Sequence, residues 1–270
     1  MNKTVAIFGM GWLGQKLANH LDKLNYHVKG SVMTLEKATQ LQQRGFDTYR
    51  IVISDHGVEG RTPALLKDVD YVVILIPPGL RRATGANYFL KMKHLAEEIE
   101  KHEIPNVIFA SSISVYDDSQ GSVTEQHTPE PETMSAKQLL ESEQLFMNSS
   151  AFKTTVIRFG GMFGGSRQPL RYLAGRKNLK EGRAPINLIH REDCIGIITS
   201  IITNDAMGYI FNAVYPEHPA KADYYIERAK RVGLEPPSFE SYYSMETYKR
   251  VDSENLDKIL NYTFKKSIRD

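Results

Sequence analysis

The chain has 270 residues and a mass of 30.6 kDa, with 34 lysine and arginine residues against 32 aspartate and glutamate residues and a net charge of +2. Hydrophobic residues make up 41% and charged residues 24%, which excludes a disordered or collagen-like chain. So small a net charge argues against a nucleic-acid binder, and a single cysteine, Cys194, excludes internal disulfides and a cysteine-rich metal site.

Apolar runs stay well below the ~20 residues that a membrane-spanning helix requires. The N-terminus passes from Met1 almost directly into the short apolar run 5–8, a pattern unlike that of a signal peptide. We therefore expect a cytoplasmic protein with no membrane partner. The sequence leaves the oligomeric state open, with a homodimer as one option.

Short apolar segments alternate with longer amphipathic segments along the chain. Several short segments are apolar at successive positions, which is typical of parallel strands covered on both faces. Leucine residues at helical spacing from Leu13 to Leu24 predict the first helix. In chain order the predicted elements are strand 4–8, helix 13–24, strands 26–32, 47–53 and 71–76, helix 88–101, strand 106–110, helix 135–148, strand 154–158, helix 193–203 and strand 209–213.

This succession of strand, helix and strand predicts an α/β fold with a doubly wound parallel sheet of the Rossmann type. The alternation breaks at the glycine- and arginine-rich residues 165–185 and again after residue 213. We therefore predict that residues 1–164 and 186–213 form the sheet domain. Residues 165–185 and 214–270 are then a small discontinuous lobe that binds substrate.

A glycine-rich loop, residues 9–14 with the sequence GMGWLG, joins the first predicted strand to the first predicted helix. In this context a GxGxxG motif indicates dinucleotide binding. The first glycine permits a tight turn, the second lets the backbone approach a pyrophosphate, and the third lets helix and strand pack closely. The predicted binding residues are Gly9, Gly11, Trp12, Leu13 and Gly14; a tight turn without a ligand is the alternative.

The end of the second strand decides between NAD and NADP. An NAD site usually has an acidic residue there that holds the ribose 2′-hydroxyl, but residues 31–34 read SVMT and the first acidic residue is Glu36. Ser31, Thr34 and Lys37 can donate to a 2′-phosphate, although no arginine occupies this segment. We predict NADP as the cofactor and NAD as the second choice. A plain turn or helix cap at Ser31 and Thr34 is the alternative.

Further motifs follow along the chain: NVIFASSISVYD at 106–117, TMSAK at 133–137, RFGGMFG at 158–164 and IHRED at 189–193. Together with the glycine loop, they resemble the extended or atypical short-chain dehydrogenase/reductase superfamily, in its branch of NAD(P)-dependent sugar-nucleotide epimerases and dehydratases. The resemblance extends from the first strand to about residue 213. It implies an NAD(P)-binding Rossmann domain and redox chemistry on a small molecule.

The resemblance implies catalytic roles for three residues. Ser112, four positions before Tyr116, matches the active-site serine or threonine that hydrogen-bonds the reacting oxygen of the substrate. Lys137 matches the lysine of the YxxxK pair, which binds the nicotinamide ribose and lowers the pKa of the tyrosine. Thr133 stands in the tyrosine position, and its hydroxyl is far less acidic than a phenol with a pKa near ~10. Capping of the next helix is the alternative role of Thr133.

Ligands of open α/β sheets bind at the carboxyl ends of the strands. We therefore expect that the cofactor also contacts the residues at these ends, namely Ile76, Pro77, Ala110, Ser111 and Gly160, and the resemblance implies a further contact from Lys137. Arginine forks suit carboxylate or phosphate, so Arg81, Arg167 and Arg171 are candidate substrate residues, with a solvated basic loop as the alternative. Tyr116 is a further substrate candidate or a core residue.

These interpretations predict an NAD(P)-dependent oxidoreductase, epimerase or dehydratase that acts on a small anionic or nucleotide-linked substrate. The alternative is a non-catalytic NADP(H)-binding sensor or scaffold that has lost the tyrosine. No metal-ligand spacing occurs. We expect His190 to be a hydrogen-bonded buried histidine and Asp193 to cap a helix that starts at Cys194.

Overall fold

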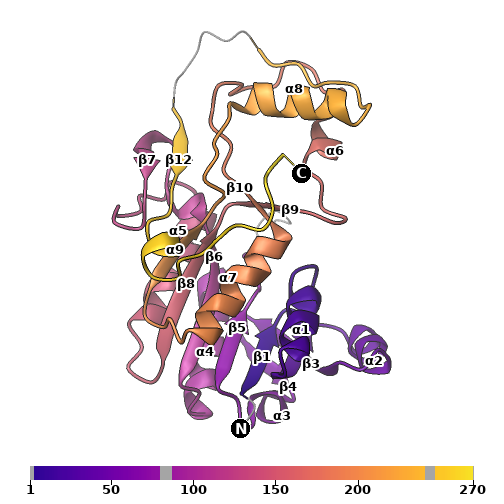
Figure 1. The fold of residues 1–270 in the computed structure, drawn as a ribbon. Coiled ribbons are helices and arrows are strands. Elements are labelled where there is room, and N and C mark those ends of the chain that lie inside the picture. The colour runs from indigo at the N-terminus through magenta and orange to yellow at the C-terminus, as the bar shows by residue number, and fades with distance from the viewer. Residues whose placement is uncertain (1–2, 80–86, 241–246, 270) are drawn as a thin grey trace. The chain divides into compact units, whose positions relative to one another are not determined.

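The computed structural model describes residues 3–79, 87–240 and 247–269 (Figure 1). The chain forms two compact units. The first contains residues 1–115, 131–158 and 198–210, and the second contains residues 116–130, 159–197 and 211–270. The lobe expected from the sequence, 165–185 and 214–270, falls within the second unit, which also takes in 116–130, 159–164, 186–197 and 211–213.

A largely parallel sheet has the strand order β11-β8-β6-β5-β1-β2-β3-β4, and all of it except residues 159 and 211–213 belongs to the first unit. Its strands are β1 (Thr4–Phe8), β2 (His27–Val32), β3 (Asp47–Ser54), β4 (Gly57–Gly60), β5 (Tyr71–Ile74), β6 (Asn106–Ser112), β8 (Lys153–Phe159) and β11 (Ile210–Ala213). β1 lies at the centre and pairs in parallel with β2 and β5. The predicted doubly wound α/β fold is confirmed. The sequence prediction missed β4, an antiparallel edge strand beside β3.

Four helices correspond to those that the apolar spacing predicts: α1 (Gly14–Lys23), α4 (Tyr88–Lys101), α5 (Met134–Met147) and α7 (Arg191–Thr203). The sequence prediction missed α2 (Leu35–Gln43) and α3 (Thr62–Leu66). In α1, Leu17 and Leu21 are fully buried, as their spacing predicts. Within the described ranges, no helix is long and apolar enough to cross a membrane.

The second unit contains two small parallel sheets and has an apolar core of its own. β7 (Gly121–Val123) pairs with β12 (Lys249–Val251), and β9 (Gly161–Phe163) pairs with β10 (Leu188–His190). Its helices are α6 (Leu170–Leu173), α8 (Lys221–Arg231) and α9 (Asn255–Lys258), with 3₁₀ turns at Asp118–Gln120 and, in the first unit, at Ile113–Val115. Leu170 of α6 and Tyr224, Tyr225 and Ala229 of α8 share one buried cluster with Ile268.

Asp193 has a different role from the one that its sequence position indicates. The helix begins at Arg191, so Asp193 lies inside the first turn of α7 and is fully buried. Its carboxylate accepts hydrogen bonds from the Tyr262 hydroxyl at 3.0 Å and from the Lys265 amide at 2.7 Å. The expected helix cap is therefore wrong: Asp193 anchors the C-terminal segment. His190 is half-buried, and its Nδ1 accepts from the Glu192 amide at 3.2 Å.

A buried ion pair joins α5 to the sheet of the first unit. Arg158 on β8 donates to both carboxylate oxygens of Glu143 on α5, with N–O distances of 2.7 to 3.1 Å. Both side chains are only 3% exposed. Ser111, at the end of β6, donates a short hydrogen bond to the same carboxylate. The helix that carries Thr133 and Lys137 is thus fixed to the strand end that carries Ser111.

We expect that Arg158→Met lowers the free energy of unfolding by about 3–5 kcal/mol, because Glu143 remains as a buried charge without its partner. The double variant Glu143→Leu/Arg158→Met should be destabilised less, since no unpaired charge remains. Urea unfolding measures both. If the single and double variants lost equal stability, the unpaired Glu143 charge would not be the cause of the loss in Arg158→Met.

Candidate cofactor and substrate site

Protein packing accounts for two of the three glycines in the loop between β1 and α1. Gly9 has a φ of 107°, and a Cβ there would lie 3.0 Å from the Leu75 carbonyl oxygen. A Cβ on Gly14 would collide with the Gly9 carbonyl oxygen. At Gly11, in contrast, a Cβ would meet only the Gly9 oxygen at 4.0 Å. The absence of a side chain at Gly11 therefore leaves space beside the backbone, which is what a pyrophosphate requires.

The start of α1 also differs from the starts of α2, α4 and α5. Those helices are capped by the side chains of Thr34, Asn87 and Thr133, which accept hydrogen bonds from first-turn amides. The residue before α1 is Leu13, which provides no side-chain cap. Uncapped N–H groups and the positive end of the helix dipole attract anions. The loop and the helix start together fit the diphosphate of a dinucleotide.

The three candidate 2′-phosphate donors at and after the end of β2 have different environments. Ser31 is 4% exposed, and its carbonyl accepts a hydrogen bond from the Met10 amide at 2.9 Å. The Thr34 hydroxyl is exposed and accepts from the Lys37 amide at 3.3 Å, so Thr34 is the cap of α2. The Lys37 side chain is exposed and is the charged donor of the three.

Arg44 is a cation near the glycine loop that the sequence interpretation missed. Its guanidinium donates to Gln15 Oε1 at 3.2 Å, and Gln15 Nε2 donates to the Met10 carbonyl at 3.0 Å. Arg44 and Lys37 line one groove between α1 and α2, together with Gln15, Gln40, Leu41 and Gln43. Two cations thus flank a groove next to the loop. Arg44 stands beyond the far end of α2 in the sequence, so only the fold reveals its position.

The segment after β5 is held by a buried tyrosine. The Tyr88 hydroxyl donates to the Ile76 carbonyl at 2.9 Å, and the Tyr88 amide donates to Gln138 Oε1 at 2.8 Å. Burial and the nearby Glu143 charge raise the pKa of Tyr88 well above its usual range, so the phenol remains a donor. Tyr88 therefore fixes the backbone before Pro77. Arg81 lies outside the described residues.

The serine cluster at the end of β6 has two distinct environments. Ser111 is buried and bonded to Glu143, whereas Ser112 is half-buried and its Oγ accepts from the Ser114 amide at 3.1 Å. Ala110, the preceding residue, is half-buried. Since its oxygen already accepts a backbone N–H, the Ser112 hydroxyl has its proton available to donate. The helix α5 packs against β6 and the 3₁₀ turn that follows it.

Thr133 is the residue that precedes and caps α5, and Lys137 lies in the first turn of the helix. The Thr133 hydroxyl accepts from the Ala136 amide at 3.2 Å, which is the cap role named as the alternative. The Lys137 amide donates to the Thr133 carbonyl at 2.9 Å, and the Lys137 side chain is exposed. A catalytic role for Thr133 stays a prediction, but its hydroxyl has a structural partner.

The remaining predicted site residues belong to the second unit. Tyr116 is fully buried, with its hydroxyl 3.1 Å from the Thr124 carbonyl oxygen and 3.2 Å from Asn212 Oδ1, which favours the core role. A Cβ on Gly160 would lie 2.8 Å from the Asn187 carbonyl, so packing alone requires that glycine. Arg167 and Arg171 are exposed. Across the described ranges, no cluster of three potential metal ligands occurs.

Comparison with known proteins agrees with this geometry. Residues 9–205 match the family described as NAD(P)H-binding. The chain belongs to this family. It is 34% identical to Protein YeeZ of Escherichia coli K12 over 264 residues, which is 97% of this chain and 96% of that protein. The loop at residues 9–14, which has the geometry for a dinucleotide site, lies within the matched residues.

Solved structures with the same fold include sugar-nucleotide enzymes. MoeE5, in complex with UDP-glucose and NAD, superposes with a TM-score of 0.79 and is 17% identical in sequence. The match covers 98% of this chain and 95% of the MoeE5 chain. UDP-glucuronic acid 4-epimerase from Bacillus cereus, in complex with NAD, has a TM-score of 0.78 at 20% identity. The match covers 99% of this chain and 93% of the epimerase chain. This chain therefore shares its fold with these NAD-bound structures, as the motifs predict.

The two glycines Gly11 and Gly14 should respond differently to substitution. Gly11→Val should leave the melting temperature unchanged, because its side chain meets open space, yet weaken dinucleotide binding at least about tenfold by occupying the pyrophosphate position. Gly14→Ala should lower the melting temperature, since its Cβ collides with the Gly9 carbonyl. Calorimetric titration with NADPH and thermal unfolding separate the two effects. Unchanged affinity in Gly11→Val contradicts the site.

The cap role of Thr133 has its own signature. Thr133→Ala should lower the free energy of unfolding by about 1 kcal/mol, because the Ala136 amide loses its acceptor, whereas Thr133→Ser should keep nearly all of it. Urea unfolding of the two variants tests this. If both variants were equally stable, the hydroxyl would not cap α5.

Proposed function

We propose that this protein is an NADP(H)-dependent oxidoreductase or epimerase of the short-chain dehydrogenase type, acting on a small anionic or nucleotide-linked substrate. The observation that carries the proposal is the loop at Gly11, open on the ligand side while Gly9 and Gly14 are closed by packing. When bound, the nicotinamide accepts or supplies a hydride at a carbinol or carbonyl carbon. In this proposal the first unit binds the cofactor and the second unit binds the substrate.

Ser112 and Lys137 are the chain's own groups for this chemistry. The Thr133 and Ser112 hydroxyls both accept a backbone N–H and both keep their proton. We assign proton donation toward the reacting oxygen to Ser112, because it stands in the position of the active-site serine or threonine that the motif at 106–117 resembles. The Lys137 ammonium, on the exposed side of α5, is suited to bind ribose hydroxyls. The Glu143–Arg158 ion pair keeps α5, which carries Lys137, in place relative to β6, which carries Ser112; its role is to position these two residues.

Preference for NADP rests on Lys37 and Arg44. Both line the groove beside the glycine loop, and the end of β2 has no carboxylate that would repel a 2′-phosphate. Arginine and lysine contacts to phosphate are charge-assisted and stronger than neutral hydrogen bonds. NAD is the second choice.

The substrate is proposed to be anionic because of the basic segment that contains Arg167 and Arg171. MoeE5 and the Bacillus cereus epimerase bind UDP-linked sugars according to their descriptions, which supports a nucleotide-linked substrate as one form of this anion. Arg81 and Tyr116 stay predictions, although the burial of Tyr116 speaks against direct contact with substrate.

A second candidate function is a non-catalytic NADP(H)-binding sensor or scaffold. Threonine in place of tyrosine at position 133, with its hydroxyl used as a helix cap, favours this alternative. It shares the cofactor site with the first proposal and differs from it in turnover.

The cofactor preference is testable by charge removal. Lys37→Gln and Arg44→Gln should each weaken NADPH binding about tenfold and leave NADH binding unchanged, because the two cofactors differ only in the 2′-phosphate. Lys16→Gln, an exposed lysine on α1 that does not line the groove, is the matched control. Equal losses for NADPH and NADH would rule out a 2′-phosphate contact.

Catalysis is testable at Ser112. With a panel of small anionic carbonyl compounds, the wild type should oxidise NADPH, and Ser112→Ala should reduce the rate about 10²–10⁴-fold through loss of the proton donor. Ser114→Ala removes an exposed neighbouring hydroxyl and should leave the rate unchanged. Normal NADPH binding without turnover of any compound would support the sensor instead.

A further inference from the structure

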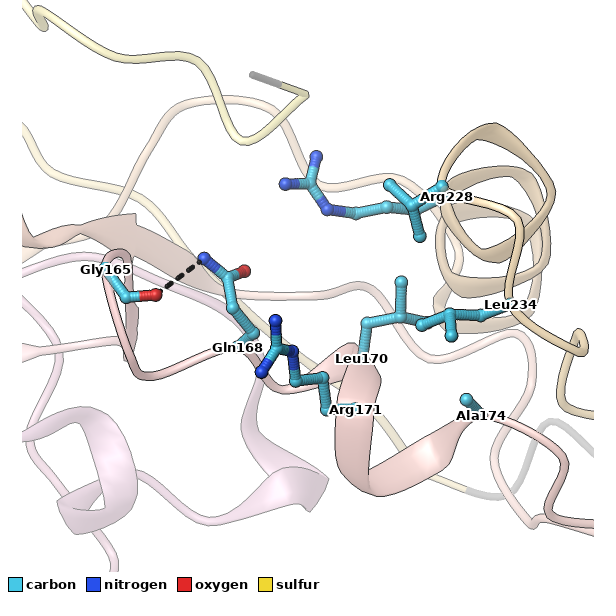
Figure 2. A pocket seen from close by; sticks show the side chains of 8 residues that line it. Gly165, Gln168, Leu170, Arg171, Ala174, Arg228 and Leu234 are labelled. Carbon is cyan, nitrogen blue, oxygen red and sulfur yellow. Dashed lines mark hydrogen bonds between the residues drawn. The ribbon is translucent and has the colours of Figure 1, made fainter.

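A cavity of about 530 Å³ lies between α6 and α8 in the second unit. Figure 2 shows the side chains around it. One part of its lining is apolar, formed by Leu170, Ala174, Val232 and Leu234, and the other is polar, formed by Gly165, Gln168, Arg171 and Arg228. A volume of this size lies in the range of small-molecule pockets, roughly 300–1,000 Å³.

Positive charge is concentrated on the polar side of this cavity. Among the described residues, its lining contains two guanidinium groups and no carboxylate. Figure 2 shows Arg171 from α6 and Arg228 from α8 pointing into the same space. Two acidic residues next to lining residues are paired elsewhere: Glu235 with Lys177 at 2.6 Å and Glu227 with Arg269 at 3.3 Å. The field inside the cavity therefore favours an anion.

Two of the polar side chains, Arg228 and Gln168, are held in place before any ligand binds. Arg228 Nη1 donates to the Ile268 carbonyl at 3.4 Å, and the Tyr224 hydroxyl, one turn earlier on α8, donates to the same oxygen at 2.8 Å. Gln168 Nε2 donates one hydrogen to the Gly165 carbonyl at 3.3 Å (Figure 2), and its second hydrogen can be donated to an oxyanion. Fixed donors reduce the entropy lost on binding.

Part of the apolar side of the cavity is exposed to solvent. Leu170 is 5% exposed and belongs to the core of the second unit, whereas Val232 is 52% and Leu234 38% exposed at the end of α8. Burying the last two side chains under an apolar group of a ligand would remove their surface from water. The anion-binding side and this apolar side face one space.

We infer that this cavity is the recognition subsite for the substrate and takes a molecule that joins one carboxylate or phosphate to an apolar aromatic or aliphatic body. This inference rests on the proposed function in one respect: the proposed function identifies the occupant of the cavity as the substrate. Guanidinium forks bind either oxyanion. The exposed Val232 and Leu234 side chains favour an apolar body over a fully hydroxylated one.

Phenyl phosphate and inorganic phosphate are the probes for this subsite. In calorimetric titrations of the full chain, phenyl phosphate should bind with one-to-one stoichiometry and at least about tenfold more tightly than inorganic phosphate. Arg171→Gln and Arg228→Gln should each weaken phenyl phosphate about tenfold. Arg176→Gln, an exposed arginine in the same basic segment that does not line the cavity, should have no effect. Leu234→Ser should weaken phenyl phosphate and leave inorganic phosphate unchanged.

Two results of these titrations would overturn the inference, and a third result, in Gly11→Val, would do so as well. One is equal affinity for the two probes, which would mean that the apolar side makes no contribution. The other is phenyl phosphate binding that survives Arg171→Gln and Arg228→Gln. The same titration in Gly11→Val separates this inference from the cofactor site: phenyl phosphate should bind normally there while NADPH does not. Phenyl phosphate binding that is lost in Gly11→Val would contradict a subsite within the second unit.

Discussion

The close approach of α1 to β1 is the constraint on which the candidate site depends. The helix starts so near the strand that a single Cβ on Gly14 would overlap the Gly9 carbonyl oxygen. This approach puts the uncapped first turn of α1 next to Gly11, where the backbone meets open space. The anion-binding position that we propose there depends on helix packing and on the absence of a side-chain cap, and needs no charged side chain.

Buried polar contacts hold the neighbouring loops at the same edge of the sheet. Tyr88 fixes the Ile76 carbonyl after β5, and Glu143 fixes Ser111 after β6 while it is itself held by Arg158. A buried ion pair adds little net stability, but here it fixes the position of one helix relative to two strands. The proposed chemistry at Ser112 and Lys137 relies on that fixed geometry, since the tyrosine that would otherwise supply the proton is absent.

The sequence predicted the sheet well because its central strands are apolar on successive residues, and β4 was missed because it is short, at the edge and partly exposed. Glu143 could have been found: its spacing from Leu139 and Phe146 puts it on the buried face of α5. Arg44 and Arg228 could not, because their positions beside Gln15 and Arg171 depend on how helices pack. For Thr133 the sequence allowed two roles, and the hydrogen bond to Ala136 shows the cap.

A crystal structure of the protein with NADPH is the most direct test of the dinucleotide site. The pyrophosphate oxygens should lie within hydrogen-bond distance of the amides of Leu13 and Gly14, with the 2′-phosphate between the side chains of Lys37 and Arg44. NADPH bound away from residues 9–14, or a loop without ligand density at saturating NADPH, would contradict the account.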